Sequence, residues 1–282
     1  MKPEHAPLIP QMAGTVDGTA FSVYGVGEPL VLVHGVGMGK EIWTPQIADF
    51  SQDYQVIVYD MLGHGDSALP AADVTLRDYA DQLAGLLDHL GIAAANVVGH
   101  SMGALVVLEF ALAYPGRALR VAALNAVFMR TVEQRAAVLE RAAALAHTGV
   151  SATVDSTLDR WFGKPVPVNL QQSACMVKDF LNTVNPQGYA RTYQLFASSD
   201  AVHADGLPSL AMPALFMTGE CDPNSSPDMS RAMAALAPQG QLDIVAAERH
   251  MMNVTAPDRV NRRLRIFLET TRIGVTDSHS QE

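Results

Sequence analysis

A serine stands between two glycines in the stretch Gly99-His100-Ser101-Met102-Gly103. The apolar Val97-Val98 before it is typical of a buried strand, and the mostly apolar run from Ala104 to Ala113 after it is typical of a helix. The serine of a Gly-x-Ser-x-Gly sequence at a strand–turn–helix junction lies on a sharp, strained turn that exposes its hydroxyl group. The five residues alone also suit an ordinary tight turn, but this setting predicts that Ser101 is a nucleophile.

A serine hydroxyl is a poor nucleophile at neutral pH, so it needs a base, and the base needs an acid that orients it. For a serine at such a junction, the expected order along the chain is serine, acid, histidine. Asp222 follows the apolar segment from Ala214 to Met217, and its neighbour Glu220 is a second candidate for the acid. His250 lies between the last predicted strand and the final predicted helix. We therefore predict a triad of Ser101, Asp222 and His250.

The tetrahedral intermediate of acyl transfer carries a negative oxygen that backbone amides stabilise. One such amide is expected from Met102, directly after the serine. The helix that begins there also points its N-terminal amides toward a negative charge that forms nearby. The second is expected from Val36 in the loop from His34 to Gly39, whose glycines allow the chain to bend, although a simple flexible connection would look the same. We expect His34 to brace this loop by hydrogen bonds. The turn Gly63-His64-Gly65-Asp66-Ser67 is interpreted as structural.

The composition argues against several other classes of protein. The formal net charge of -10 opposes nucleic-acid binding, which needs a basic face. Cys175 and Cys221 are too few for a disulfide framework and have no histidines at metal-ligand spacing. The chain shows no apolar run of the length of a membrane span or a signal peptide. We expect a cytoplasmic protein that acts on a small molecule without a metal or an organic cofactor, and a homodimer is left open.

Strand and helix patterns alternate along most of the chain, and the strand patterns are apolar, as in strands buried on both faces. The strand patterns are Leu30 to Val33, Gln55 to Tyr59, Val97-Val98, Val121 to Leu124, Ala214 to Met217 and Gln241 to Val245. Helical patterns run from Leu76 to Leu90, from Ala104 to Ala113 and from Pro257 to Thr270. This alternation predicts an α/β fold with a doubly wound, mostly parallel sheet.

The alternation breaks between Ala126 and Asp205, where helical segments rich in Ala, Leu and Arg predict an inserted helical cap. Within it, Thr131 to Gln134 resembles a capping box that begins a helix running to about His147, and Gly149 supplies a stop. We therefore predict a core from residues 1–125 and 206–272, a cap from residues 126–205 and a flexible tail from residues 273–282.

From about Gly18 to Leu268 the chain resembles the α/β-hydrolase family. The resemblance rests on His34-Gly35, Tyr59 to Gly65, the Ser101 turn, Asp222 and His250. Within the family it is similar to 3-oxoadipate enol-lactonases and to the aminoacrylate hydrolases of pyrimidine breakdown. That similarity rests on Trp43-Thr44-Pro45-Gln46, Arg160-Trp161-Phe162, Asn185 to Ala190, His250 to Asn253 and Pro257.

The resemblance implies a serine hydrolase that acts through an acyl-enzyme on a small ester, enol-lactone or enamide from aromatic or heterocycle catabolism. Enol-lactonases usually carry a serine-rich oxyanion loop, whereas this chain has His34-Gly35-Val36-Gly37. This departure weakens the lactone assignment, and hydrolysis of an enamide C–N bond in a ring-opened heterocycle fits the same resemblance.

The predicted cap carries many arginines for an acidic protein, and an arginine binds a carboxylate through two parallel hydrogen bonds. We hypothesise that Arg130 or Arg160 binds a carboxylate of the substrate above the triad. Trp161, Phe162 and Phe128 are candidates for an apolar wall of the substrate site, and ordinary packing within the cap is the alternative for each.

Two other functions fit the same residues. A C–C bond hydrolase of ring-cleavage diketones uses the same triad and a similar cap, and a ligand-binding receptor keeps the fold without turnover. Dehalogenases and epoxide hydrolases of the family have an aspartate where this chain has Ser101.

Overall fold

A computed structural model describes residues 8–270, with the backbone alone for residues 146–148. Its sheet has eight strands in the order β1-β2-β4-β3-β5-β6-β7-β8. The strands are β1 (Met12–Val16), β2 (Thr19–Tyr24), β3 (Glu28–Val33), β4 (Tyr54–Tyr59), β5 (Ala95–His100), β6 (Ala118–Leu124), β7 (Ala214–Gly219) and β8 (Gly240–Val245). Strand β2 pairs antiparallel with β1 and β4, and every later neighbour in the order is parallel. The mostly parallel α/β fold expected from the sequence is therefore confirmed.

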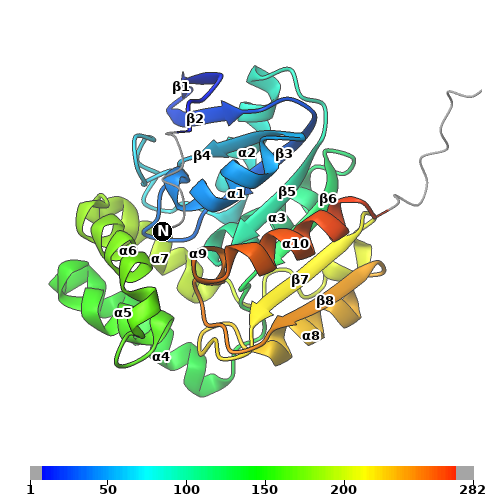
Figure 1. The fold of residues 1–282 in the computed structure, drawn as a ribbon. Helices are drawn as coiled ribbons and strands as arrows, with labels where there is room; N and C mark the ends of the chain where they lie inside the picture. Colours follow the sequence, from blue (N-terminus) through cyan, green and yellow to red (C-terminus); the bar gives the residue numbers. More distant parts are fainter. Residues whose placement is uncertain (1–7, 271–282) are drawn as a thin grey trace, which may run out of the picture.

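Helices cover both faces of the sheet, as the continuous apolar strands require. Figure 1 shows α1 (Thr44–Phe50) and α10 (Pro257–Leu268) on the near face, and α2 (Leu76–His89), α3 (Met102–Ala113) and α8 (Pro227–Leu236) on the far face. Helix α3 is apolar on all sides and packs against β5, β6 and α2, so nearly all of its residues are buried. It is therefore held rigidly directly after Ser101.

Four α-helices lie between β6 and β7: α4 (Val132–Thr148), α5 (Val154–Phe162), α6 (Gln171–Thr183) and α7 (Pro186–Ser198). They fall within the segment 126–205 that the sequence predicts as a cap, and Figure 1 shows them grouped together at one side of the sheet. Helix α4 packs on α7, and α5 packs on α6. The Thr131 side chain accepts from the Gln134 amide and Gln134 accepts from the Thr131 amide, which confirms the capping box.

Five short helical segments complete the described chain: η1 (Lys40–Trp43), η2 (Ser151–Thr153), η3 (Val168–Leu170), η4 (Leu207–Ser209) and α9 (Met252–Thr255). Among residues 8–270, no helix has the length and apolar character needed to cross a bilayer. The tail predicted for residues 273–282 lies outside the described residues.

Candidate active site

Three polar residues follow three parallel strands at the same edge of the sheet. Ser101 comes directly after β5, Asp222 follows β7 and His250 follows β8. The carboxyl ends of parallel strands lie at one edge, where ligand sites of open α/β sheets gather. All three side chains are buried. The topology therefore brings together residues up to 149 positions apart in the sequence.

The turn that carries Ser101 is tightly constrained. Ser101 has φ 56° and ψ -114°, a backbone conformation that costs a non-glycine residue about 1–3 kcal/mol. A Cβ atom at Gly99 would lie 2.0 Å from the Gly103 carbonyl oxygen, and one at Gly103 would lie 2.2 Å from the Val33 carbonyl oxygen. Both glycines are thus required for the strand and the helix to approach so closely, and the turn projects the Ser101 side chain from this edge.

A continuous hydrogen-bond chain joins the three predicted triad residues. His250 Nε2 lies 3.1 Å from Ser101 Oγ, and His250 Nδ1 lies 2.8 Å from Asp222 Oδ2. Because Nδ1 donates to the carboxylate, Nε2 is free to accept the serine proton. The exposed alternative acid, Glu220, instead accepts from the Ala247 amide. The geometry places Asp222, and not Glu220, beside His250.

The Asp222 carboxylate is held by groups besides His250. Asn125 Nδ2 donates to Oδ2 at 2.8 Å, and the Asn224 amide donates to Oδ1 at 2.8 Å. Burial alone would raise the pKa of Asp222, but the charge of His250 and the hydrogen bonds of His250, Asn125 and the Asn224 amide hold it below its ordinary value. Asp222 therefore stays ionised at neutral pH, as the acid of a triad must.

The two residues predicted to donate oxyanion amides lie close to Ser101. Val36 and Ser101 line the same cavity, and Met102 is the first residue of α3. Within residues 8–270, no hydrogen bond is found for the amide of Val36 or Met102. Amides without a partner are the kind of donor that a developing negative oxygen requires.

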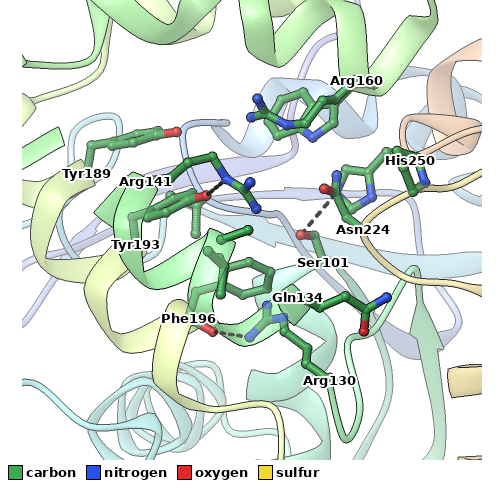
Figure 2. A pocket seen from close by; sticks show the side chains of 15 residues that line it. Ser101, Arg130, Gln134, Arg141, Arg160, Tyr189, Tyr193, Phe196, Asn224 and His250 are labelled. Carbon is green, nitrogen blue, oxygen red and sulfur yellow. Dashed lines mark hydrogen bonds between the residues drawn. The ribbon is translucent and has the colours of Figure 1, made fainter. Parts of the chain in front are cut away.

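A cavity of about 190 Å³ lies between this edge of the sheet and helices α4, α5 and α7 (Figure 2). It is lined by Val36, Ser101, Arg130, Gln134, Ala137, Val138, Arg141, Arg160, Trp161, Tyr189, Tyr193, Phe196, Pro223, Asn224 and His250. Among residues 8–270 there is no group of histidine, cysteine, aspartate and glutamate side chains that could hold a metal ion.

The arginines that line the cavity differ in their partners. Arg130 is almost fully buried, lies 3.4 Å from Asp200 Oδ1 and donates to the carbonyl oxygens of Phe196 and Ala197. Its guanidinium also stacks over the Phe196 ring at 4.7 Å. Arg130, one of the two predicted carboxylate-binding residues, thus already has a carboxylate partner within the protein.

Within the described residues, Arg160 and Arg141 have no such partner. Arg160 donates to Ser156 O and Thr157 Oγ1, while its buried Nε atom has no hydrogen-bond partner within the described residues. Arg141 donates to the Tyr193 hydroxyl at 3.3 Å, and no ion pair is found for either arginine in residues 8–270. Burial, reinforced by the charge of Arg141, lowers the pKa of Arg160. Figure 2 shows both side chains bordering the space in front of Ser101.

The predicted aromatic residues separate in the structure. Trp161 lines the cavity, with its ring centroid 5.3 Å from that of His250. Phe128 and Phe162 are not among the lining residues and belong to the buried apolar cluster instead.

The sequence interpretation did not single out Arg141 or Tyr193 as site residues. A signal was present for Arg141, because Gln134, Ala137, Val138 and Arg141 recur at the helical spacing of one face, and all four line the cavity. The spacing identifies one face of the helix, but it does not predict that this face contacts a cavity.

Comparisons with known proteins identify the family of the chain. A family model described as the alpha/beta hydrolase fold matches residues 28–257. The chain is 42% identical to an (E)-2-((N-methylformamido)methylene)succinate hydrolase of Acinetobacter baylyi, over 88% of this chain and 92% of that protein. It is 26% identical to 3-oxoadipate enol-lactonase 1 of the same organism, over 82% of this chain and 84% of that protein.

Solved structures show the same likeness. An enol-lactonase from Burkholderia xenovorans LB400 superposes with a TM-score of 0.82 at 26% identity, over 92% of this chain and 100% of that chain. A thermophilic esterase from Thermogutta terrifontis, solved with malate bound, gives a TM-score of 0.81 at 26% identity, over 93% and 98%. The fold, the matched family model and these relatives together show that the chain belongs to the α/β-hydrolase family.

Proposed function

We propose that this protein hydrolyses a small dicarboxylate substrate, cutting an enamide C–N bond through an acyl-enzyme on Ser101. The observation that carries the substrate class is the pair Arg141 and Arg160, which have no carboxylate partner in the described chain and line the same cavity as Ser101. Both arginines are partly buried, and a partly desolvated guanidinium without a counter-charge is unfavourable, so an anionic ligand is the natural complement of this cavity.

The first half of the reaction follows from the hydrogen-bond chain. Ser101 Oγ attacks the substrate carbonyl carbon while its proton passes to His250 Nε2. The negative charge that develops on the carbonyl oxygen is stabilised by the Val36 and Met102 amides and by the N-terminus of α3. Asp222 stabilises the imidazolium that forms. His250 then protonates the leaving nitrogen, and the C–N bond breaks.

The second half uses the same groups in reverse. Water gives a proton to His250 Nε2 and attacks the ester of Ser101, and the amides of Val36 and Met102 again hold the oxygen. The C–O bond to Ser101 breaks, Ser101 regains its proton, and a carboxylic acid leaves the site. The two halves of the reaction use only the three triad side chains, the two backbone amides and one water molecule.

The relative at 42% identity supports an enamide as substrate, since its name describes a succinate that carries an N-methylformamido-methylene group. Such a molecule has two carboxylates and one acylated enamine nitrogen. Its two negative charges match the two unpaired arginines, and its formamide carbonyl is the electrophile for Ser101. The Thermogutta esterase was solved with malate, which is also a dicarboxylate.

The substrate class is tested by the variants Arg141→Gln and Arg160→Gln. A hydrogen bond to a charged group contributes about 1.5–3 kcal/mol, so each variant should lower kcat/KM for a dicarboxylate enamide by about 10- to 100-fold. Hydrolysis of the neutral ester p-nitrophenyl acetate should change by less than about threefold, because it offers no charge to the arginines.

The matched control is Arg231→Gln on α8, where an exposed arginine pairs with Asp228. This variant should leave both reactions unchanged. Equal losses on the charged and the neutral substrate in the cavity variants would contradict the proposal.

A further inference from the structure

Two loops beside the candidate active site are tied together by reciprocal hydrogen bonds. The first is the oxyanion loop, residues 34–40, which follows β3, and the second is the brace loop, residues 60–67, which follows β4. The Gly37 amide donates to His64 Nε2 at 2.9 Å, and the Met61 amide donates to His34 Nε2 at 3.0 Å. Each loop thus provides one histidine acceptor for an amide of the other.

These bonds fix the tautomer of both rings. Because Nε2 accepts in each ring, the proton is on Nδ1, and it is donated to Gly35 O by His34 at 2.8 Å and to Leu62 O by His64 at 3.2 Å. Both rings are fully buried, and burial lowers the pKa of His64 to about 3 and also lowers the pKa of His34. At neutral pH both rings are therefore uncharged, and each acts as donor and acceptor at once.

The bonds act on the two peptide planes that flank Val36. The Val36 amide shares a rigid plane with the Gly35 carbonyl, which accepts from His34 Nδ1. The next plane, between Val36 and Gly37, is held by the Gly37 amide on His64. With both planes fixed, the direction of the Val36 N–H is set before any substrate enters.

We propose that His64 is a positioning residue for the oxyanion hole, acting through Gly37 on the amide of Val36. This inference rests on the proposed function, in which Val36 donates to the developing oxyanion. It also assigns a role to the turn Gly63-His64-Gly65-Asp66-Ser67, whose backbone places the His64 ring against the oxyanion loop. His64 touches no reacting atom, so its effect is on the alignment of a donor.

The role predicts a specific kinetic signature in the variant His64→Leu. Removing the acceptor releases the Gly37 amide, and a donor displaced by a fraction of an ångström should lower kcat for p-nitrophenyl acetate by about tenfold. The KM should stay within about twofold, because no substrate contact is lost. The inhibition constant of phenylboronic acid, which forms a tetrahedral adduct on serine, should rise about tenfold in parallel.

Two further variants separate positioning from stability. His64→Gln presents an amide oxygen close to the position of Nε2 and should restore kcat to within about threefold of the wild type. His203→Leu removes another buried histidine, one that pairs with Glu109 away from the cavity, and should lower Tm while leaving kcat unchanged. The proposal is overturned if His64→Leu lowers Tm but keeps kcat and boronate affinity within twofold.

A measurement on the wild-type protein applies even if His64→Leu does not fold. Nitrogen-15 NMR should show His64 protonated at Nδ1, with a scalar coupling across the hydrogen bond from the Gly37 amide to Nε2. A His64 ring protonated at Nε2 would overturn the proposal. The neutral ester needs neither Arg141 nor Arg160, so failure of the dicarboxylate assignment and failure of this inference give different results.

Discussion

The sheet edge and the helices that face it across the cavity differ in whether their polar side chains have partners within the protein. At the sheet edge, the side-chain polar atoms of Ser101, His250 and Asp222 are all hydrogen-bonded within the protein. Across the cavity, Arg141 and Arg160 carry charges for which the described chain offers no counter-charge. The triad side chains therefore have their partners before a ligand arrives, whereas under the proposed function a dicarboxylate ligand supplies the charges that the two arginines lack.

Under the proposed function, this difference separates the residues of the chemical step from those that recognise the substrate. The sheet edge positions its groups through backbone turns and strand ends, so its geometry follows from the fold and serves many substrates. The facing helices contribute long side chains, whose contacts depend on the residues at a few positions along α4 and α5. Substitutions in the two regions should therefore affect different measured quantities.

The largest effect is expected from Ser101→Ala. Removing the nucleophile should reduce kcat by about a millionfold for every substrate and should abolish labelling by a fluorophosphonate probe. Ser198→Ala, at an exposed serine of α7, is the control and should keep both properties. If Ser101→Ala retains turnover and labelling, the acyl-enzyme is ruled out. A wild-type protein that binds dicarboxylates but hydrolyses no substrate would instead favour the receptor function.

The next largest effect is expected from Asp222→Asn. An asparagine at this position can orient His250 in the wrong tautomer and cannot stabilise the imidazolium, which should lower kcat by about 10⁴-fold with little change in KM. Glu220→Gln, two residues earlier on the same turn, is the matched control. It should keep full activity, because the Glu220 carboxylate accepts from the Ala247 amide and not from His250. The opposite result for the two variants would assign the acid to Glu220.

The sequence predicted the sheet edge well because the constraints there are local. The glycines around Ser101 indicate its turn, and a strand end precedes both Asp222 and His250. Parallel strand pairing then brings the three ends together without further information. Even the Thr131 capping box involves residues only three positions apart.

The cap contacts could not be predicted in the same way. Arg130 pairs with Asp200, a residue 70 positions away that carries no sequence signal as its partner. Arg141 was one of several cap arginines, and its selection requires knowing which face of α4 meets the cavity. Strands β1 and β2 were also missed. Strand β1 is mainly exposed and lacks the apolar pattern of a buried strand, whereas β2 is buried but interrupts its apolar residues with Thr19 and Ser22.

The smallest effect on activity is expected from Asp200→Asn. This variant should leave the triad intact and should destabilise the cap side of the cavity. The change removes the carboxylate partner of buried Arg130 and should cost about 3 kcal/mol of unfolding free energy at pH 7. Asp228→Asn, in an exposed pair with Arg231, is the control and should leave Tm unchanged.

The cost of Asp200→Asn should also depend on pH. Burial alone would raise the pKa of Asp200, but hydrogen bonds from Arg135 and the Arg130 amide, with the charges of both arginines, hold it below its ordinary value. The carboxylate thus stabilises the fold above the unfolded pKa of about 3.9, and this is lost as the pH falls through the lower folded value. The difference in Tm between the wild type and Asp200→Asn should therefore become smaller below about pH 4. A difference that stays constant there would contradict this explanation.

The strained backbone conformation of Ser101 has a consequence for the evolution and the engineering of this protein. At φ 56° a glycine would relieve the local cost, so replacement of the nucleophile by glycine favours the folded state while it removes the reaction. Selection for thermal resistance alone would drive this position toward an inactive sequence. Under the proposed function, selection for turnover opposes this replacement, so directed evolution of the protein must screen for hydrolysis and heat tolerance together.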